Sequence, residues 1–297
     1  MKFNELVGMP SKEMIALSVC RAADMDVLKP IYRLYQESDM TFHLVDDKET
    51  LQSLLQELDA SLLDSERIVM HHADSDTEAA EAAVSLVASG DAHMLMKGMV
   101  PTSIILKAVL NKAHNLIEKP VLSHVALFDL PQYDKAVLIT DCAMNINPNV
   151  EQKEAIIMNA VEVAHNLGIN TPKVALLAAV EQVNPKIQST VDAHDLKTKL
   201  KDNGNFIIDG PLQYDLAISK SASRIKGLDS PVAGESDILI APALDAGNML
   251  YKSLVYSAGA NVAAIIVGAK VPIVLTSRAD DSEVKYLSIK LAMHNIK

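Results

Sequence analysis

The stretch that decides the fold is AVLITDCAMNINPNVEQKEAIIMNAVEVAHNLGINTPKVALLAAV, residues 136–180. It opens with a short aliphatic run at 136–140 and closes with another at 174–180, and both are expected to be β-strands. Between them, residues 150–167 repeat apolar side chains at helical spacing, with Asn149 and Gln152 suited to cap the first turn. A strand, a helix and a strand in this order predict one unit of an α/β fold.

The same alternation extends in both directions from this unit. Each further aliphatic run is continuous rather than alternating, which is typical of parallel strands buried on both faces. Open parallel sheets bind ligands at the carboxyl ends of their strands, so functional residues are expected in the loops that follow each strand. Further strands are predicted at residues 93–97, 206–208, 237–241, 263–267 and 272–276, and helices from about residue 102 and around residues 284–291.

Length and charge exclude several classes of protein. At about 150 residues per domain, 297 residues predict two domains. The chain has 27 Lys+Arg against 38 Asp+Glu, and the net charge of −11 argues against nucleic acid and anionic membranes as partners. Arginine occurs only at positions 21, 33, 67, 224 and 278, so a site that binds an anion through a guanidinium has few candidates.

Other features point to the cytoplasm. Two cysteines provide no disulfide framework and fit a reducing compartment, and residues 1–5 lack the apolar segment of a signal peptide. Residues 253–269 carry no charge, but Gly259 and Asn261 interrupt them, so a helix, a turn and a strand are expected rather than a membrane span. We therefore expect a soluble, cytoplasmic protein.

The chain lacks the common motifs for nucleotide binding and ester hydrolysis. It contains neither GxxxxGK[ST], nor GxGxxG after a strand, nor GxSxG. His71, His72 and Asp74 could suggest a metal cluster, but adjacent histidines point in different directions on regular structure, so a solvated turn is favoured. No metal site is predicted.

Several polar residues stand at predicted strand ends. Ser277 and Arg278 precede a helix, where free backbone N–H groups, a hydroxyl and a guanidinium suit a phosphate, although a serine cap with an exposed arginine explains them equally well. Lys97 ends a buried strand and either meets an anion or extends to solvent. Asp141 and Asp209 precede turns, where capping of the turn is the ordinary role of aspartate.

Taken in order, eight segments closely resemble the phosphate acetyl/butyryltransferase family, and more specifically its butyryl branch. The resemblance covers about residue 90 to the C-terminus, and the first 90 residues carry little that matches. The segments are LMKGMVPTSIILKAVLNK, LSHVALFDLP, ITDCAMNINPNVEQK, AVEVAHNLGI, PKVALLAAVEQVNPK, DGPLQYDLAIS, SPVAGESDILIAPALDAGNMLYKSLVY and VGAKVPIVLTSRADD.

The resemblance implies an enzyme that catalyses butanoyl-CoA + phosphate = butanoyl phosphate + CoA by direct transfer in a ternary complex. It implies two α/β/α domains with mostly parallel sheets, similar to isocitrate/isopropylmalate dehydrogenases, with an active cleft between the domains. Residues 1–123 with 262–297 would form the first domain and residues 124–261 the second. The resemblance further implies a homodimer or higher homo-oligomer, no permanently bound cofactor, CoA and phosphate as substrates, and a place in butanoate or branched-chain acid metabolism beside an acyl-phosphate kinase.

The family pattern also assigns residues. Arg278 would pair with the phosphoryl group and Ser277 would hydrogen-bond the acyl centre. The acetyl branch carries an aspartate as base where this chain has Val284, so the neighbouring Glu283 is the substitute expected here. The residues expected to line the CoA and acyl sites are Lys97, Gly98, Thr102, Asp141, Asn145, Asn147, Asp209, Gly210, Pro211, Asp245, Gly247 and Asn248.

Alternatives remain at this level. A phosphate acetyltransferase is the nearest one, because a methylene changes pocket affinity by only about 1–3 kcal/mol and spacing does not give the acyl-chain length. A metal- and NAD-dependent oxidoreductase on the related fold would need carboxylate ligands and a nicotinamide site that no motif supplies. A non-catalytic acyl-CoA-binding protein would tolerate loss of Arg278.

Overall fold

The computed structural model describes residues 1–8, 15–276 and 280–297. The chain divides into two compact units. The middle unit comprises Met1–Leu6 and Lys119–Val262, and the terminal unit comprises Val7–Glu118 and Ala263–Lys297. The expected boundaries placed residues 1–6, 119–123 and 262 in the first domain, whereas this division groups them with the middle unit.

The terminal unit is built on a mostly parallel sheet with strand order β3-β2-β1-β4-β11-β10. Its strands are β1 (Ala16–Cys20), β2 (Thr41–Asp46), β3 (Ile68–His72), β4 (Met94–Lys97), β10 (Asn261–Val267) and β11 (Ile273–Val274). Among the described strands of this unit, only β10, antiparallel to β11, breaks the common direction.

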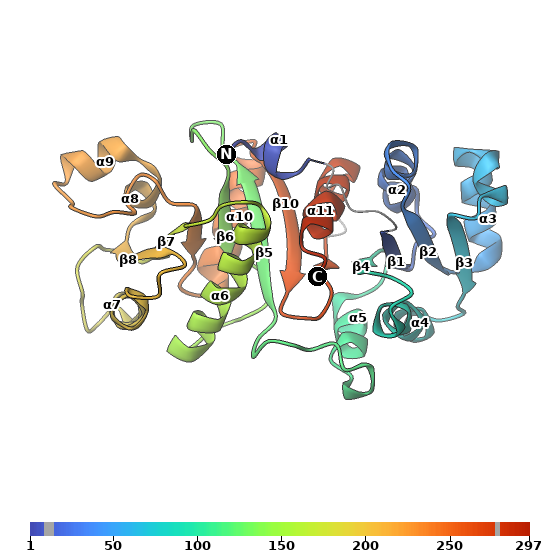
Figure 1. The fold of residues 1–297 in the computed structure, drawn as a ribbon, viewed down its shortest axis with the longest axis horizontal. Helices are drawn as coiled ribbons and strands as arrows, with labels where there is room; N and C mark the ends of the chain where they lie inside the picture. The colour runs from blue at the N-terminus through green and yellow to red at the C-terminus, as the bar shows by residue number, and fades with distance from the viewer. Residues whose placement is uncertain (9–14, 277–279) are drawn as a thin grey trace. The chain divides into compact units, whose positions relative to one another are not determined.

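Helices cover both faces of this sheet. On one face α2 packs against α11, and on the other α4 packs against α5 (Figure 1). The helices are α2 (Met25–Glu37), α3 (Lys48–Leu58), α4 (Asp76–Ser89), α5 (Thr102–Val109) and α11 (Ser282–His294), with short 3-10 turns η1 (Ala60–Asp64) and η2 (Lys112–His114).

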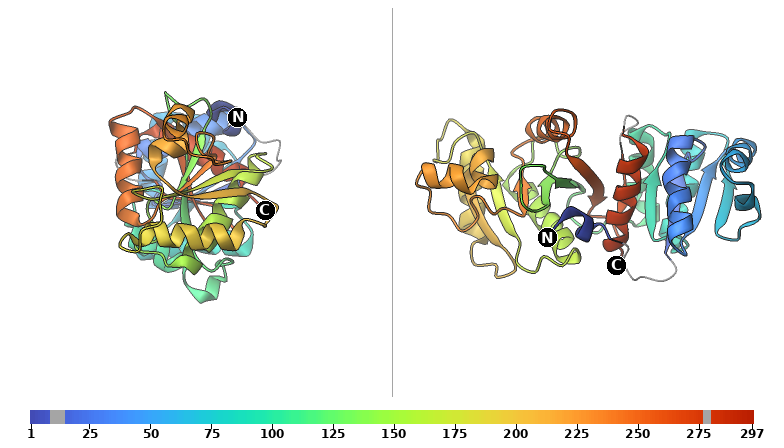
Figure 2. Two further views of the ribbon diagram at one scale, coloured as in Figure 1. Left: turned by 90° about the vertical axis from the view of Figure 1, so that its left-hand side faces the viewer. Right: turned by 90° about the horizontal axis from the view of Figure 1, so that it is seen from above.

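The middle unit repeats this layered plan with strand order β5-β6-β9-β7-β8, in which β5 is antiparallel to β6 and the other pairs are parallel. The views of Figures 1 and 2 place α6 in front of the sheet and α10 behind it. The strands are β5 (Ser123–Asp129), β6 (Val137–Thr140), β7 (Lys173–Leu177), β8 (Ile207–Leu212) and β9 (Ile238–Ile240). The helices are α1 (Phe3–Leu6), α6 (Val150–Asn166), α7 (Gln188–Leu200), α8 (Tyr214–Ile218), α9 (Lys220–Ile225) and α10 (Leu244–Tyr256).

Local sequence explains where these elements begin and end. Asn149 and Gln152 form the reciprocal capping box at the start of α6, which confirms the prediction, and Gly168 follows the helix with φ of +82°. The uncharged run at 253–269 contains the end of α10, a left-handed Gly259 and the buried strand β10, as expected. No helix in the described part of the chain is long and apolar enough to cross a membrane.

Candidate active site

In the terminal unit, Lys97 and Gly98 leave the carboxyl end of β4. Lys97 is only 4% exposed, and its Nζ donates to the carbonyl oxygen of Gly98 at 3.2 Å. The Gly98 N–H donates to the Cys20 carbonyl at 2.8 Å, and a Cβ at residue 98 would lie 2.0 Å from the Arg21 carbonyl oxygen. Only glycine fits this close approach. Thr102, the first residue of α5, is exposed nearby in the chain.

The strand that leads to the predicted phosphate-binding residues runs beside β4. In the parallel register of β11 and β4, Val274 pairs with Met96, so the carboxyl ends of both strands lie at one edge of the sheet. The chain leaves β11 and reaches Thr276, which is buried. Ser277 and Arg278 lie outside the described residues, and their roles stay predictions.

Glu283 lies in the first turn of α11 and forms an ion pair with Arg33 of α2. Its Oε2 accepts from Arg33 Nη1 at 2.8 Å, and Arg33 also stacks on the Tyr286 ring at 3.7 Å. The Glu283 side chain is 55% exposed. This surface ion pair between α2 and α11 gives Glu283 a structural role, so its role as the catalytic base stays a prediction.

In the middle unit, the carboxylate of Asp141 organises the loop after β6. The residue is buried, and its Oδ1 accepts the backbone N–H groups of Ala143 at 2.8 Å and Met144 at 2.9 Å. Its Oδ2 accepts from the side-chain amide of Asn145 at 2.6 Å, which also donates to the Leu122 carbonyl at 2.8 Å. The ordinary capping role of aspartate is thus present, and it fixes a loop at the carboxyl edge of the sheet.

Helix α10 is docked onto this loop through the predicted aspartate-x-glycine-asparagine segment. A Cβ at Gly247 would lie 2.3 Å from the Asp141 carbonyl oxygen, so glycine permits the contact. Asn248 Nδ2 donates to the Cys142 carbonyl at 3.1 Å, whereas Asp245 is exposed in the first helical turn. The structure therefore brings Asp141, Asn145, Gly247 and Asn248 together.

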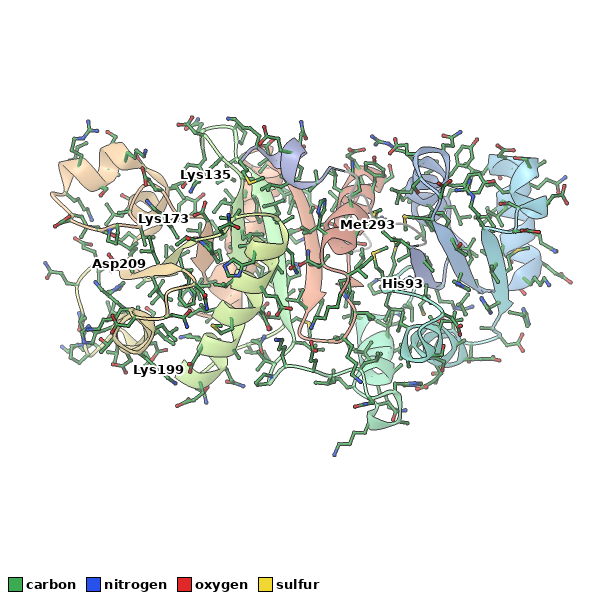
Figure 3. All side chains as sticks on the ribbon, in the orientation of Figure 1. His93, Lys135, Lys173, Lys199, Asp209 and Met293 are labelled. Atoms are coloured by element: carbon green, nitrogen blue, oxygen red, sulfur yellow. The ribbon has the colours of Figure 1, made fainter. Side chains whose placement is uncertain are left out.

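The predicted turn at 209–211 is wrong, because Asp209, Gly210 and Pro211 lie inside β8. Asp209 is labelled in Figure 3. Asp209 is buried and forms an ion pair with Lys197 of α7 at 2.6 Å. A Cβ at Gly210 would lie 2.6 Å from the Leu176 Cβ, so strand packing explains the glycine. A glycine and a proline suggested a turn, but β8 is the last strand of the sheet order, where proline is tolerated. A substrate role for the three residues stays a prediction.

A hollow of about 550 Å³ opens beside the loop that follows β6. Asn147 lines it, together with the beginnings of α6 and α7 and the turn after β9. Lys153 and Asp192 also line it and form an ion pair at 2.5 Å, with side chains 7% and 9% exposed. Asp192 Oδ1 also accepts from Gln188 Nε2 at 2.7 Å. Sequence reasoning missed this pair, because its members are far apart in the chain and only Lys153 lies in a segment that carries the family resemblance.

The nucleophilic and metal-binding groups of the described residues are limited. Burial raises the pKa of the Cys20 thiol to about 12 and raises the pKa of the Cys142 thiol as well, so neither supplies a thiolate near neutral pH. His71 contacts His43 at 3.0 Å while His72 contacts Asp74 at 3.0 Å, so the two histidines do not converge. The part of the chain that the structure describes contains no cluster able to hold a metal ion.

Known proteins align with nearly the whole chain. A family profile described as phosphate acetyl/butaryl transferase matches residues 38–293. A probable phosphate butyryltransferase of Bacillus subtilis is 44% identical over 99% of this chain and 97% of its own length. A phosphate acetyltransferase of Thermotoga maritima is 37% identical over 98% of this chain and 99% of its own length.

Solved structures agree. A branched-chain phosphotransacylase from Enterococcus faecalis superposes with a TM-score of 0.87 at 39% identity, covering 95% of this chain and 99% of that one. A 4-hydroxythreonine-4-phosphate dehydrogenase from Salmonella typhimurium, at 13% identity, shares the fold with a TM-score of 0.60, covering 95% of this chain and 99% of that one. The dehydrogenase-like fold is thereby confirmed. The chain belongs to the phosphate acetyl/butaryl transferase family and is an acyltransferase.

Proposed function

We propose that this protein transfers the butanoyl group between CoA and inorganic phosphate: butanoyl-CoA + phosphate = butanoyl phosphate + CoA. The observation that carries the choice of acyl group is the 44% identity, over nearly the full length, to a protein named probable phosphate butyryltransferase. The related protein named phosphate acetyltransferase makes acetyl-CoA the second candidate. No permanently bound cofactor is needed for either reaction.

In the proposed mechanism both substrates are bound before the acyl group moves. A phosphate oxygen attacks the thioester carbonyl, the C–S bond breaks, and the CoA sulfur leaves and takes up a proton. The two buried, high-pKa thiols support this direct route, because neither cysteine is an ionised nucleophile near neutral pH. Arg278 would bind the phosphoryl group, Ser277 the acyl oxygen, and Glu283 would exchange the proton with sulfur.

The remaining substrate-binding roles follow the strand ends. Lys97 and Thr102 would contribute from the terminal unit, and the loop fixed by Asp141 would contribute from the middle unit. We also propose that the protein is a homodimer, that it lies in the cytoplasm and that it acts in butanoate metabolism.

The test is release of CoA thiol from acetyl-, butanoyl- and isobutanoyl-CoA, with and without phosphate. The proposal requires phosphate-dependent release that is fastest with butanoyl-CoA and that is lost in Arg278→Ala. Initial rates at several concentrations of both substrates should give intersecting double-reciprocal lines. Parallel lines, or exchange of labelled CoA into butanoyl-CoA without phosphate, would instead indicate a covalent acyl-enzyme. Light scattering of the eluting protein gives the oligomeric state.

A further inference from the structure

Arg21 occupies an unusual place directly after β1. Its backbone is left-handed, with φ of +54°, which a residue other than glycine seldom adopts. Its side chain holds two carboxylates: Nη1 donates to Asp46 at 2.6 Å and Nε donates to Asp76 at 2.6 Å. Asp46 ends β2 and Asp76 begins α4, so the guanidinium ties the end of β1 to two neighbouring elements. These ion pairs hold the backbone of Arg21 in its unfavourable conformation.

The backbone of this residue in turn holds the Lys97–Gly98 turn. The carbonyl oxygen of Arg21 accepts the Met99 N–H at 2.9 Å, and the carbonyl oxygen of Cys20 accepts the Gly98 N–H at 2.8 Å. Gly98 packs so closely on the Arg21 carbonyl that a Cβ at residue 98 would lie 2.0 Å from its oxygen. The position of the turn after β4 therefore depends on the peptide at Arg21.

Lys97 belongs to the same arrangement. It pairs with Cys20 in the parallel register of β1 and β4, and its buried ammonium donates to the Gly98 carbonyl. A change in the peptide at Arg21 would move this turn and with it the ammonium group. Direct binding of an anion by Arg21 is disfavoured, because the two flanking carboxylates carry more negative charge than the guanidinium carries positive charge.

We infer that Arg21 is a positioning residue for the phosphate acyltransferase reaction: through its left-handed backbone, held by Asp46 and Asp76, it sets the Lys97–Gly98 turn. The inference rests on the proposed function in assigning Lys97 to the substrate site. It does not depend on any contact between Arg21 and a substrate.

The three variants Arg21→Ala, Arg21→Gly and Arg21→Lys separate the possible roles. Glycine adopts positive φ without a side chain to hold it, whereas alanine does not. We expect kcat/KM for phosphate to fall about 10- to 100-fold in Arg21→Ala, since small displacements of positioning groups have costs of this size, and to recover in large part in Arg21→Gly. Recovery in Arg21→Lys but not in Arg21→Gly would show direct action of the charge and overturn the inference. Unchanged kinetics in folded Arg21→Ala would overturn it too.

Hydrogen exchange gives a readout that needs no activity. The amides of Gly98 and Met99 should exchange faster in Arg21→Ala than in the unaltered protein, and more slowly again in Arg21→Gly. Arg67→Ala is the matched control. Arg67 lies just before β3, at the opposite end of the strands from Arg21, and its guanidinium donates to the Ser38 and Tyr35 carbonyls. Protected amides at 98 and 99 in Arg21→Ala would refute the positioning role. Absence of phosphate-dependent activity in the unaltered protein would instead refute the proposed function and leave the exchange result standing.

Discussion

Removal of Lys153 tests the buried ion pair that joins α6 to α7. The Lys153 and Asp192 side chains are almost fully buried and lie 2.5 Å apart. Deleting Lys153 leaves the buried Asp192 carboxylate with the Gln188 amide but without a charged partner, at a cost of about 3–5 kcal/mol. Lys153→Met should therefore raise the unfolding equilibrium constant about 150- to 4,000-fold. In the double variant Lys153→Met/Asp192→Leu both charges are gone, and stability should return close to that of the unaltered protein or exceed it.

The same two helices provide the control. Lys199 of α7 pairs with Glu154 of α6 at 2.5 Å on the surface (Lys199 is labelled in Figure 3), and Lys199→Met should leave the unfolding midpoint nearly unchanged. Urea unfolding followed by far-UV circular dichroism measures all four proteins. If Lys153→Met unfolds at the same urea concentration as Lys199→Met, or if the double variant is no more stable than Lys153→Met, the reasoning is refuted.

Three further outcomes follow from the structure. Gly247→Ala should destabilise the protein by about 1–3 kcal/mol in urea unfolding, because its Cβ would overlap the Asp141 carbonyl; stabilisation, as expected for alanine in an unobstructed helix, would contradict the contact. Cys20 and Cys142 should resist iodoacetamide at pH 8 in the native protein and react after unfolding, as mass spectrometry can establish; rapid native modification would contradict their raised pKa values. Hydrogen bonds from Lys173 of β7 and Lys220 of α9 lower the pKa of Glu235 to about 2. The contribution of this carboxylate to the stability of the fold is therefore present above about pH 4.5 and is lost as the pH falls towards 2. Melting temperatures measured across this window should fall less steeply in Glu235→Gln than in the unaltered protein, and parallel curves would argue against the effect.

Much of the fold could be predicted because the strands are buried on both faces. The runs at 136–140 and 174–180 became β6 and β7, and the capping box of α6 formed as its residues indicate. These features depend on neighbours in sequence. The error at 209–211 has the same origin: a glycine and a proline favour a turn locally, but pairing with β7 and packing on Leu176 decide for a strand.

The candidate site was predictable only as a set of loops. Strand ends pointed to Lys97 and Asp141, since polar residues that follow buried strands are visible in the sequence. The sequence did not show which side chains would form ion pairs across the fold. Arg21 finds Asp76 only after β1, β2 and α4 have assembled, and Lys153 finds Asp192 only when α6 and α7 meet. Side-chain partners that tertiary packing selects leave no periodic signal in the chain.

The division of the chain also has a consequence for biosynthesis. All parts of the middle unit have been translated once Val262 emerges, whereas the terminal unit still lacks most of β10 and all of β11 and α11 at that stage. Until they appear, the β4 edge that pairs with β11 stays open, and the α2 surface that packs on α11 stays uncovered. Open strand edges and uncovered apolar surfaces promote aggregation of nascent chains. The terminal unit is therefore the one expected to need chaperones while the chain is still being translated.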